Sequence, residues 1–295
     1  MGGVALLRNT ISFSGVQDHG ILLSQFLGSS RSLETLAFEE VYSHSTSSYD
    51  KPDRTAFILH GLLGSGRIWR SFSRNLASTL SDSPSATESL CPPHDMVNAA
   101  KDLSNLVYSH GWDWPDVVIG HSMGGKIALQ FAESCAHGDY GVSASLPKQL
   151  WVLDSVAGEV NKGTKGDVEK VLETLQGLPS SVPSRNNLRK SGEQEKWAFN
   201  LEGAVKMFKS YREKSYWSLL EHPPKGLEIA MVHAENSDRW EPDAVERLET
   251  HAAREGDESQ GKVSLHVLCN AGHWVHVDNP KGLLEIIAPN MMPLN

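Results

Sequence analysis

Cysteine, excess basic charge and long apolar runs are all scarce in this chain. Its 295 residues include 3 cysteines and carry a net charge of −9. Cys91, Cys135 and Cys269 are spaced too widely and irregularly for a disulfide framework or a metal motif, which favours a reducing compartment. The acidic balance argues against nucleic acid or an anionic membrane surface as the main partner. Since no apolar run reaches the roughly 20 residues of a membrane span, we expect a soluble, intracellular protein.

The first 33 residues have a composition of their own. Arg8 and Arg31 lie among many serines, and Asp18 is the only acidic residue. This pattern is compatible with a mitochondrial or plastid transit segment, and equally with an unstructured N-terminus of a cytoplasmic protein. We treat residues 1–33 as an N-terminal extension.

Apolar strand patterns alternate with helical patterns along the rest of the chain. The predicted strands are 36–42, 55–59, 116–119, 150–153, 227–232 and 263–268, and the predicted helices are about 69–80, 95–108, 126–132 and 282–287. This alternation indicates a mainly parallel, doubly wound α/β sheet with ligands at the carboxyl ends of its strands. We assign residues 34–155 and 226–295 to this core.

Residues 118–126 read V-I-G-H-S-M-G-G-K and carry the strongest functional signal. Gly120, Ser122 and Gly124 fit the G-x-S-x-G nucleophile elbow, in which a strand turns sharply into a helix and exposes the serine. A β-branched run precedes the motif and a helical pattern follows it, as the elbow requires. We therefore interpret Ser122 as a candidate nucleophile, in preference to a solvated serine in a glycine-rich loop.

A serine nucleophile needs a base and a site for the oxyanion. His273 follows the last predicted strand and is our candidate base, whereas His276 is assigned to the next turn. The amide of Met123, directly after the serine, and the amide of Leu62, in the H-G-L turn, are the expected oxyanion donors. His60 is expected to orient that turn and not to act as a second base.

Residues 156–225 interrupt the alternation and are predicted to form a helical lid. Helical spacing occurs at 168–175 and again at 201–208, with a Pro/Ser/Asn-rich connection at 178–187 between them. The aromatic residues of this insertion either line an acyl pocket or pack the lid onto the body; they are Trp197, Phe199, Phe208, Tyr211, Tyr216 and Trp217.

Three motifs in order resemble the α/β-hydrolase superfamily: H-G-L-L-G-S from residue 60, G-H-S-M-G-G from residue 120 and A-G-H-W-V-H from residue 271. The pattern is similar to that of small esterases, the group that includes abhydrolase domain-containing protein 11 and related bacterial esterases. W-A-F-N-L-E from residue 197 and N-S at 236–237 also resemble this group. The likeness covers about residues 55–288 and implies hydrolysis of acyl esters or thioesters without a metal or an organic cofactor.

The acid of the triad has two candidates. Most α/β-hydrolases carry it after the late strand, but here Ser237 occupies that slot and Asp238 lies one place later. The small esterases share this serine and take the acid from the end of the strand after the elbow, which is Asp154 here. We favour Asp154, keep Asp238 as the alternative, and regard Ser237 as a helper that hydrogen-bonds the histidine or the carboxylate.

One element that the superfamily leads us to expect is missing. Residues 80–95 are rich in serine and contain three prolines, so we expect no strand there. This loss would expose one edge of the oxyanion-turn strand unless residues 36–42 close the gap.

The leading hypothesis is a serine hydrolase that cleaves a carboxylic ester or thioester through an acyl-enzyme on Ser122. Its partner would be a small acyl substrate, with no nucleic acid and no membrane insertion, and the sequence defines neither the acyl chain nor the oligomeric state. The alternative is a non-catalytic ligand receptor, or an inactive variant, that retains the triad. Candidate substrate contacts are His60, His121, Trp197 and Trp274.

Overall fold

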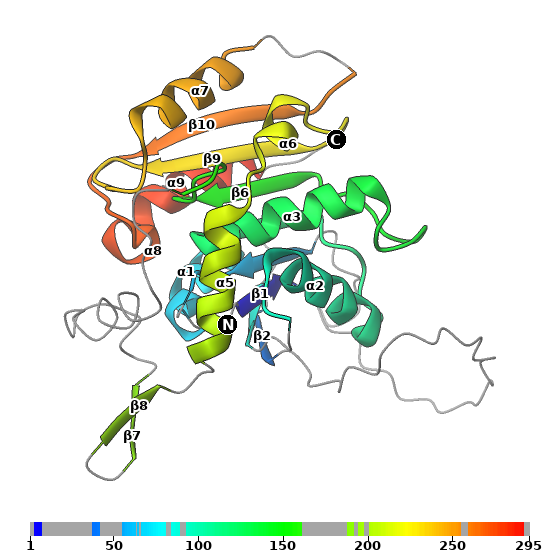
Figure 1. Ribbon diagram of the computed structural model, residues 1–295. Helices are drawn as coiled ribbons and strands as arrows, with labels where there is room; N and C mark the ends of the chain where they lie inside the picture. Colours follow the sequence, from blue (N-terminus) through cyan, green and yellow to red (C-terminus); the bar gives the residue numbers. More distant parts are fainter. Residues whose placement is uncertain are drawn as a thin grey trace.

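The main sheet has eight strands in the order β10-β9-β6-β5-β3-β1-β2-β4 (Figure 1). The computed structural model describes residues 3–7, 37–41, 55–62, 64, 66–80, 84–88, 93–160, 188–191, 194–197, 201–254 and 259–291. The strands of the main sheet are β1 Gly3–Leu7, β2 Ala37–Val41, β3 Ala56–Leu59, β4 Pro84–Glu88, β5 Val117–His121, β6 Gln149–Leu153, β9 Glu228–Ala234 and β10 Lys262–Leu268. The helices are α1 Gly66–Leu80, α2 Met96–His110, α3 Met123–His137, α5 Leu201–Glu213, α6 Trp217–Glu221, α7 Pro242–Ala252, α8 Val275–Asp278 and α9 Pro280–Asn290.

Five parallel strands, β3, β5, β6, β9 and β10, form the centre of the sheet. Their apolar residues alternate between two faces, as the twofold period of a strand requires. In β3, Phe57 packs into the core on the α2 and α3 side, whereas Ile58 packs into the core on the α1 and α9 side. β3, β5 and β6 are buried throughout, which explains why they read as nearly continuous apolar runs in the sequence.

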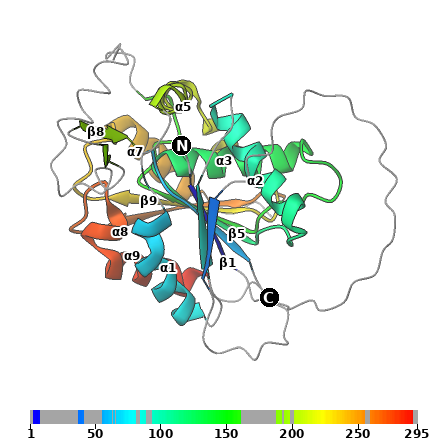
Figure 2. The ribbon, with the colours of Figure 1, turned by 90° about the horizontal axis from the view of Figure 1, so that it is seen from below.

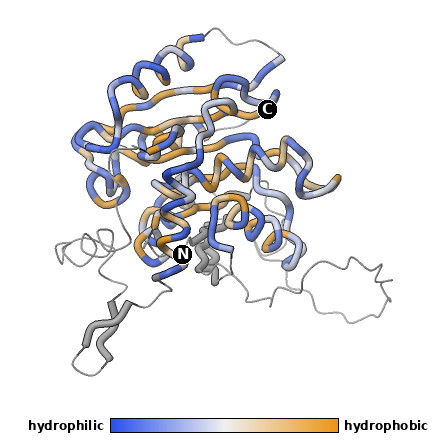
Figure 3. Tube along the Cα trace, in the orientation of Figure 1, coloured by the Kyte–Doolittle hydropathy of each residue, from blue (hydrophilic) through white to orange (hydrophobic). Residues whose placement is uncertain are grey.

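The helices cover both faces of this sheet. Figure 2 shows α2 and α3 on one side of the strands and α1 and α9 on the other. Hydrophobic residues follow the central strands, whereas the outer helix α7 is largely hydrophilic (Figure 3). Helix α2 begins at the predicted place because Asp95 caps it, accepting a hydrogen bond of 2.7 Å from the amide of Asn98. The predicted doubly wound α/β sheet is thus confirmed.

The prediction that residues 80–95 form no strand is wrong. Pro84–Glu88 forms β4, which pairs antiparallel with β1 and β2 at the far end of the sheet. Such a polar segment fits there because proline is tolerated at the first residue of a strand and at a sheet edge.

The strand that pairs with β3 is also different from the one expected. Residues 36–42 do form a strand, β2, but β1 lies between it and β3 and pairs antiparallel with β3. The sequence of β1 is uniformly apolar whereas β2 contains two glutamates, which suits β1 better to the more interior position. The sheet therefore includes Gly3–Leu7, within the segment that we treated as an extension.

The insertion between β6 and β9 contains both helices and strands. Helix α5 confirms the helical pattern at 201–208, and the antiparallel pair β7 Leu188–Ser191 and β8 Gln194–Trp197 was not predicted. The helix expected at 168–175 lies outside the described residues. We call residues 201–221, which comprise α5, α6 and the turn between them, the arm. In the part of the chain that the structure describes, none of the helices has the length and hydropathy to cross a membrane.

Candidate active site

Ser122 occupies the sharp turn between β5 and α3. Its backbone has φ 54° and ψ −121°, a conformation that L-residues rarely adopt and that usually marks a functional constraint. The turn is held by a hydrogen bond of 2.9 Å from the Ser122 amide to Leu153 O, which also binds the elbow to β6. The result is the geometry of a nucleophile elbow, with Ser122 8% exposed.

The elbow glycines are required by backbone contacts. A Cβ on Gly120 would lie 2.2 Å from the carbonyl oxygen of Gly124, and a Cβ on Gly124 would lie 2.4 Å from the carbonyl oxygen of Leu59. Because both obstacles are backbone atoms, no side-chain rotation could relieve the clash. Both positions of the G-x-S-x-G pattern must therefore be glycine because strand and helix backbones approach closely here.

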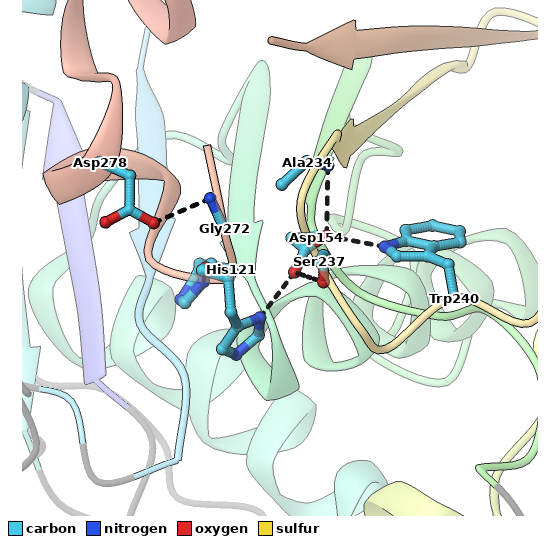
Figure 4. Close-up of polar contacts among 8 residues, drawn as sticks. His121, Asp154, Ala234, Ser237, Trp240, Gly272 and Asp278 are labelled. Carbon is cyan, nitrogen blue, oxygen red and sulfur yellow. Dashed lines mark hydrogen bonds and ion pairs between the residues drawn. The ribbon is translucent and has the colours of Figure 1, made fainter. Parts of the chain in front are cut away.

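Asp154 and His273 are in direct contact although 119 residues separate them. The Nδ1 of His273 lies 2.6 Å from Oδ2 of Asp154, whose side chain is fully buried at the end of β6. Ser237 donates to Oδ2 at 2.7 Å and Trp240 donates through Nε1 to Oδ1 at 2.7 Å (Figure 4). The Ala234 amide donates to Oδ1 at 3.3 Å, so both oxygens of the carboxylate are engaged.

These hydrogen bonds determine the charge of the pair. Burial alone would raise the pKa of Asp154, but the hydrogen bonds from His273, Trp240 and Ser237 outweigh it and hold that pKa below its ordinary value. Burial lowers the pKa of His273, although the hydrogen bond to Asp154 opposes this shift. The pair is therefore an ionised carboxylate beside a neutral imidazole at neutral pH.

The two acid candidates have different surroundings. Asp238 is exposed, and its charge acts on His273 by raising the pKa of the imidazole. Asp154 is the carboxylate in hydrogen-bond contact with His273, and Ser237 hydrogen-bonds this carboxylate, as expected of a helper. The sequence analysis did not identify Trp240. The pattern that could have indicated it is a tryptophan three positions after Ser237.

The loop that carries His273 is fixed to the elbow. His121 donates from Nε2 to the carbonyl oxygen of His273 at 2.7 Å. On the other side of His273, the Gly272 amide donates to Asp278 of α8 at 3.0 Å (Figure 4). Trp274 lies edge-on to the imidazole of His273, with ring centroids 5.7 Å apart. His121 thus has a positioning contact in addition to its suggested place near substrate.

The turn after β3 lies against the nucleophile. A Cβ on Gly61 would come within 3.0 Å of Ser122 Cβ. The Gly61 carbonyl oxygen accepts from the Gly64 amide at 3.0 Å and from His60 Nδ1 at 2.8 Å. Because the C=O and N–H of one trans peptide point in opposite directions, the Leu62 amide points away from these partners. His60, buried behind the turn, is bonded to it through the Gly61 carbonyl, and the role of the Leu62 amide as an oxyanion donor stays a prediction.

Comparison with known proteins identifies the family. The sequence profile of the Alpha/beta hydrolase family matches residues 56–286. The chain belongs to this family. No curated protein matches it in sequence.

Several solved structures share this alpha/beta hydrolase fold. The chain is 19% identical to a marine microorganism esterase over 85% of this chain and 97% of that one, with a TM-score of 0.58. It is 16% identical to a thermophilic esterase from Thermogutta terrifontis over 87% and 92%, with a TM-score of 0.57. It is 14% identical to the thioesterase domain from the curacin biosynthetic pathway over 86% and 99%, with a TM-score of 0.52. At these identities the likeness is one of fold.

Three further histidines are buried beside the site: His60, His121 and His276. His276 stacks on Trp69 with ring centroids 3.9 Å apart, and burial lowers its pKa to about 3. Burial likewise lowers the pKa of His60 to about 4 and that of His121 well below its ordinary value. They are neutral at physiological pH, which agrees with the assignment of His276 to the turn after the site.

The aromatic residues of the insertion are mainly packing residues where they are described. Tyr211 and Tyr216 are buried in the core on the α2 and α3 side, and Phe208 and Trp217 pack against it. These contacts favour the interpretation that they join the arm to the body. The side chains of Trp197 and Phe199 lie outside the described residues.

We expect Arg239→Gln to shift the acid limb of the kcat/KM profile to higher pH. The Arg239 charge lowers the pKa of His273, so its removal raises that pKa, and a higher pH is then needed for the neutral imidazole. Asp238→Asn removes a charge that raises this pKa and should shift the limb to lower pH. Ester hydrolysis across pH in low salt measures both shifts. Because Arg239 and Asp238 are exposed, both pH shifts should become smaller at about 1 M salt. Variants whose acid limbs coincide with that of wild-type protein in low salt would contradict the expectation.

Proposed function

We propose that this alpha/beta hydrolase cleaves a carboxylic ester or thioester through an acyl-enzyme on Ser122. The observation that carries the proposal is the buried His273–Asp154 hydrogen bond of 2.6 Å, in a loop that His121, the neighbour of Ser122 in the elbow, bonds at 2.7 Å. A lone serine is a poor nucleophile, and a neutral imidazole held by a carboxylate is the base that activates it.

In the proposed mechanism each group has one task. Because Nδ1 of His273 is bonded to Asp154, its Nε2 is the nitrogen that takes the proton from Ser122. Asp154 keeps the imidazole in that tautomer and stabilises the imidazolium that forms. The amides of Met123 and Leu62 bind the oxyanion, and His273 then protonates the leaving alcohol or thiol. Water hydrolyses the acyl-enzyme by the same route in reverse.

The similar structures support this reaction class but do not distinguish an ester substrate from a thioester. Two of them are described as esterases and one as a thioesterase domain, and they share this fold with the chain. An oxygen or sulfur leaving group is compatible with the same serine chemistry. Membership of the small esterase group that includes abhydrolase domain-containing protein 11 stays a hypothesis that rests on the sequence motifs.

The arm is proposed to act as a lid over the acyl group. Helix α5 contacts both α2 and α3, and α3 begins directly after Ser122. Met207 and Tyr211 of α5 are buried against the body. An acyl chain bound between arm and elbow would thus be shielded from water.

A fluorophosphonate probe tests the proposed function. We expect stoichiometric labelling of the folded protein, with the adduct mapped by peptide mass spectrometry to Ser122, together with hydrolysis of p-nitrophenyl esters. Heat-denatured protein is the control and should remain unlabelled. If folded wild-type protein neither takes the probe nor turns over esters, the hydrolase assignment fails and a non-catalytic ligand receptor becomes the better interpretation.

A further inference from the structure

Lys126 is a fully buried lysine in the helix that follows the nucleophile. It lies one helical turn after Ser122, on α3. Its ammonium group donates to three backbone carbonyls from two other segments: Gly158 O at 2.7 Å, Tyr211 O at 2.6 Å and Lys214 O at 2.7 Å. The elbow motif does not require a lysine at this position.

The geometry matches an ammonium group better than a neutral amine. An ammonium has three hydrogens, and each of the three carbonyl oxygens can accept one of them. A neutral amine has only two and would direct its lone pair at the third oxygen. Burial lowers the pKa of Lys126 to about 7, and the charge of Glu159 opposes this shift. The carbonyls at the carboxyl end of α5 also favour the cation. Lys126 therefore caps the end of α5 from a different helix.

The three acceptors join the parts of the site that must stay together. Gly158 lies four residues after Asp154, in the loop that follows the acid, and Tyr211 and Lys214 belong to the arm. That loop and the arm are also joined directly, by the Val160 amide to Arg212 O at 3.0 Å and the Tyr216 amide to Ala157 O at 2.9 Å. Lys126 connects this pair of segments to the nucleophile helix.

Packing alone does not explain the lysine. Burying a cation is costly, and an apolar side chain of similar volume, such as methionine, fills such a position at least as favourably. What methionine cannot supply is three directed donors to two chain segments. The Tyr216 hydroxyl also ties the arm to α3, by donating to Gln130 at 3.0 Å, but this bond lies a turn further from the elbow.

We propose that Lys126 is a positioning residue that clamps the arm and the acid loop to the nucleophile helix, and so holds the arm as one wall of the acyl site. This inference rests on the proposed function. It predicts that loss of the clamp affects long acyl chains more than short ones, because a long chain depends on contact with the arm.

The test compares wild-type protein with Lys126→Met and with Ile287→Ala. Ile287 is fully buried in α9, in the core on the other side of the sheet, so its truncation destabilises the fold without touching the arm. Hydrogen–deuterium exchange of peptides from residues 201–221 is measured together with kcat and KM for p-nitrophenyl acetate and octanoate. All measurements are made at a temperature where thermal melts show the three proteins folded.

In Lys126→Met we expect faster exchange in the arm while β5 and β6 stay protected. The ratio of kcat/KM for octanoate to that for acetate should fall about tenfold, mainly through KM. Ile287→Ala should leave the octanoate-to-acetate ratio unchanged and should not speed up exchange in the arm more than in the rest of the protein. Arm exchange equal to that of Ile287→Ala would overturn the clamp, and an unchanged ester ratio would overturn the positioning role.

The experiment separates this inference from the proposed function. Wild-type protein that lacks both esterase activity and probe labelling refutes the hydrolase, and with it the positioning role. The exchange data then still decide whether Lys126 clamps the arm.

Discussion

Ser122→Ala is expected to lower kcat for ester hydrolysis by about 10⁵- to 10⁶-fold and to abolish fluorophosphonate labelling. Alanine removes the nucleophile but keeps a Cβ in the same strained backbone, so the fold should be retained. Activity and labelling are measured next to a thermal melt. The residual rate would report what the oxyanion donors and substrate binding contribute without a nucleophile.

A matched serine variant controls for this substitution. Ser73 is buried in α1, and its hydroxyl has no hydrogen-bond partner among the described residues. Ser73→Ala should therefore keep full labelling and turnover, since it removes no hydrogen bond and leaves only a small void. Labelling that persists in Ser122→Ala would show that the probe reacts elsewhere and would contradict the assigned nucleophile.

Asp154→Asn is expected to lower kcat/KM by about 10⁴-fold, whereas Asp238→Asn should retain it within about threefold. Asparagine cannot favour the Nδ1–H tautomer of His273 or stabilise an imidazolium. Asp238 is exposed and acts on His273 through its charge alone. Hydrolysis of p-nitrophenyl acetate by both variants at the pH optimum of each measures the difference.

Asp154→Asn should also destabilise the protein, which the assay must separate from loss of chemistry. The carboxylate accepts hydrogen bonds from Ser237 and Trp240. In asparagine an NH₂ group, itself a donor, would replace one of the two accepting oxygens, so one of these hydrogen bonds would be lost. Urea unfolding identifies conditions in which the variant is fully folded. If folded Asp154→Asn keeps activity and Asp238→Asn loses it, the acid is Asp238 and our assignment is wrong.

Local chemistry explains which parts of the site could be predicted from sequence. The elbow can be predicted from the sequence because backbone atoms of Gly124 and Leu59 leave room only for glycine at two positions around Ser122. His273 is readable because it follows the last strand in a loop of small residues. Its contact with Asp154 agrees with the sequence-based preference, and the catalytic roles of the pair stay predictions.

Other features depend on contacts between distant segments and leave no local pattern. Trp240 approaches Asp154 only because β6 and β9 are neighbours in the sheet. Residues 84–88 pair as β4 although their composition disfavours a strand, because β1 and β2 supply the hydrogen-bond partners.

The sequence by itself determined the doubly wound fold, the glycine pattern of the elbow and His273 as the candidate base, because each rests on short-range rules of strand, helix and turn. The tertiary structure alone decided which strand covers β3, which donors hold the acid and what the buried Lys126 binds. Hydrogen-bond partners of buried polar groups are chosen by segments that meet only after the chain has folded.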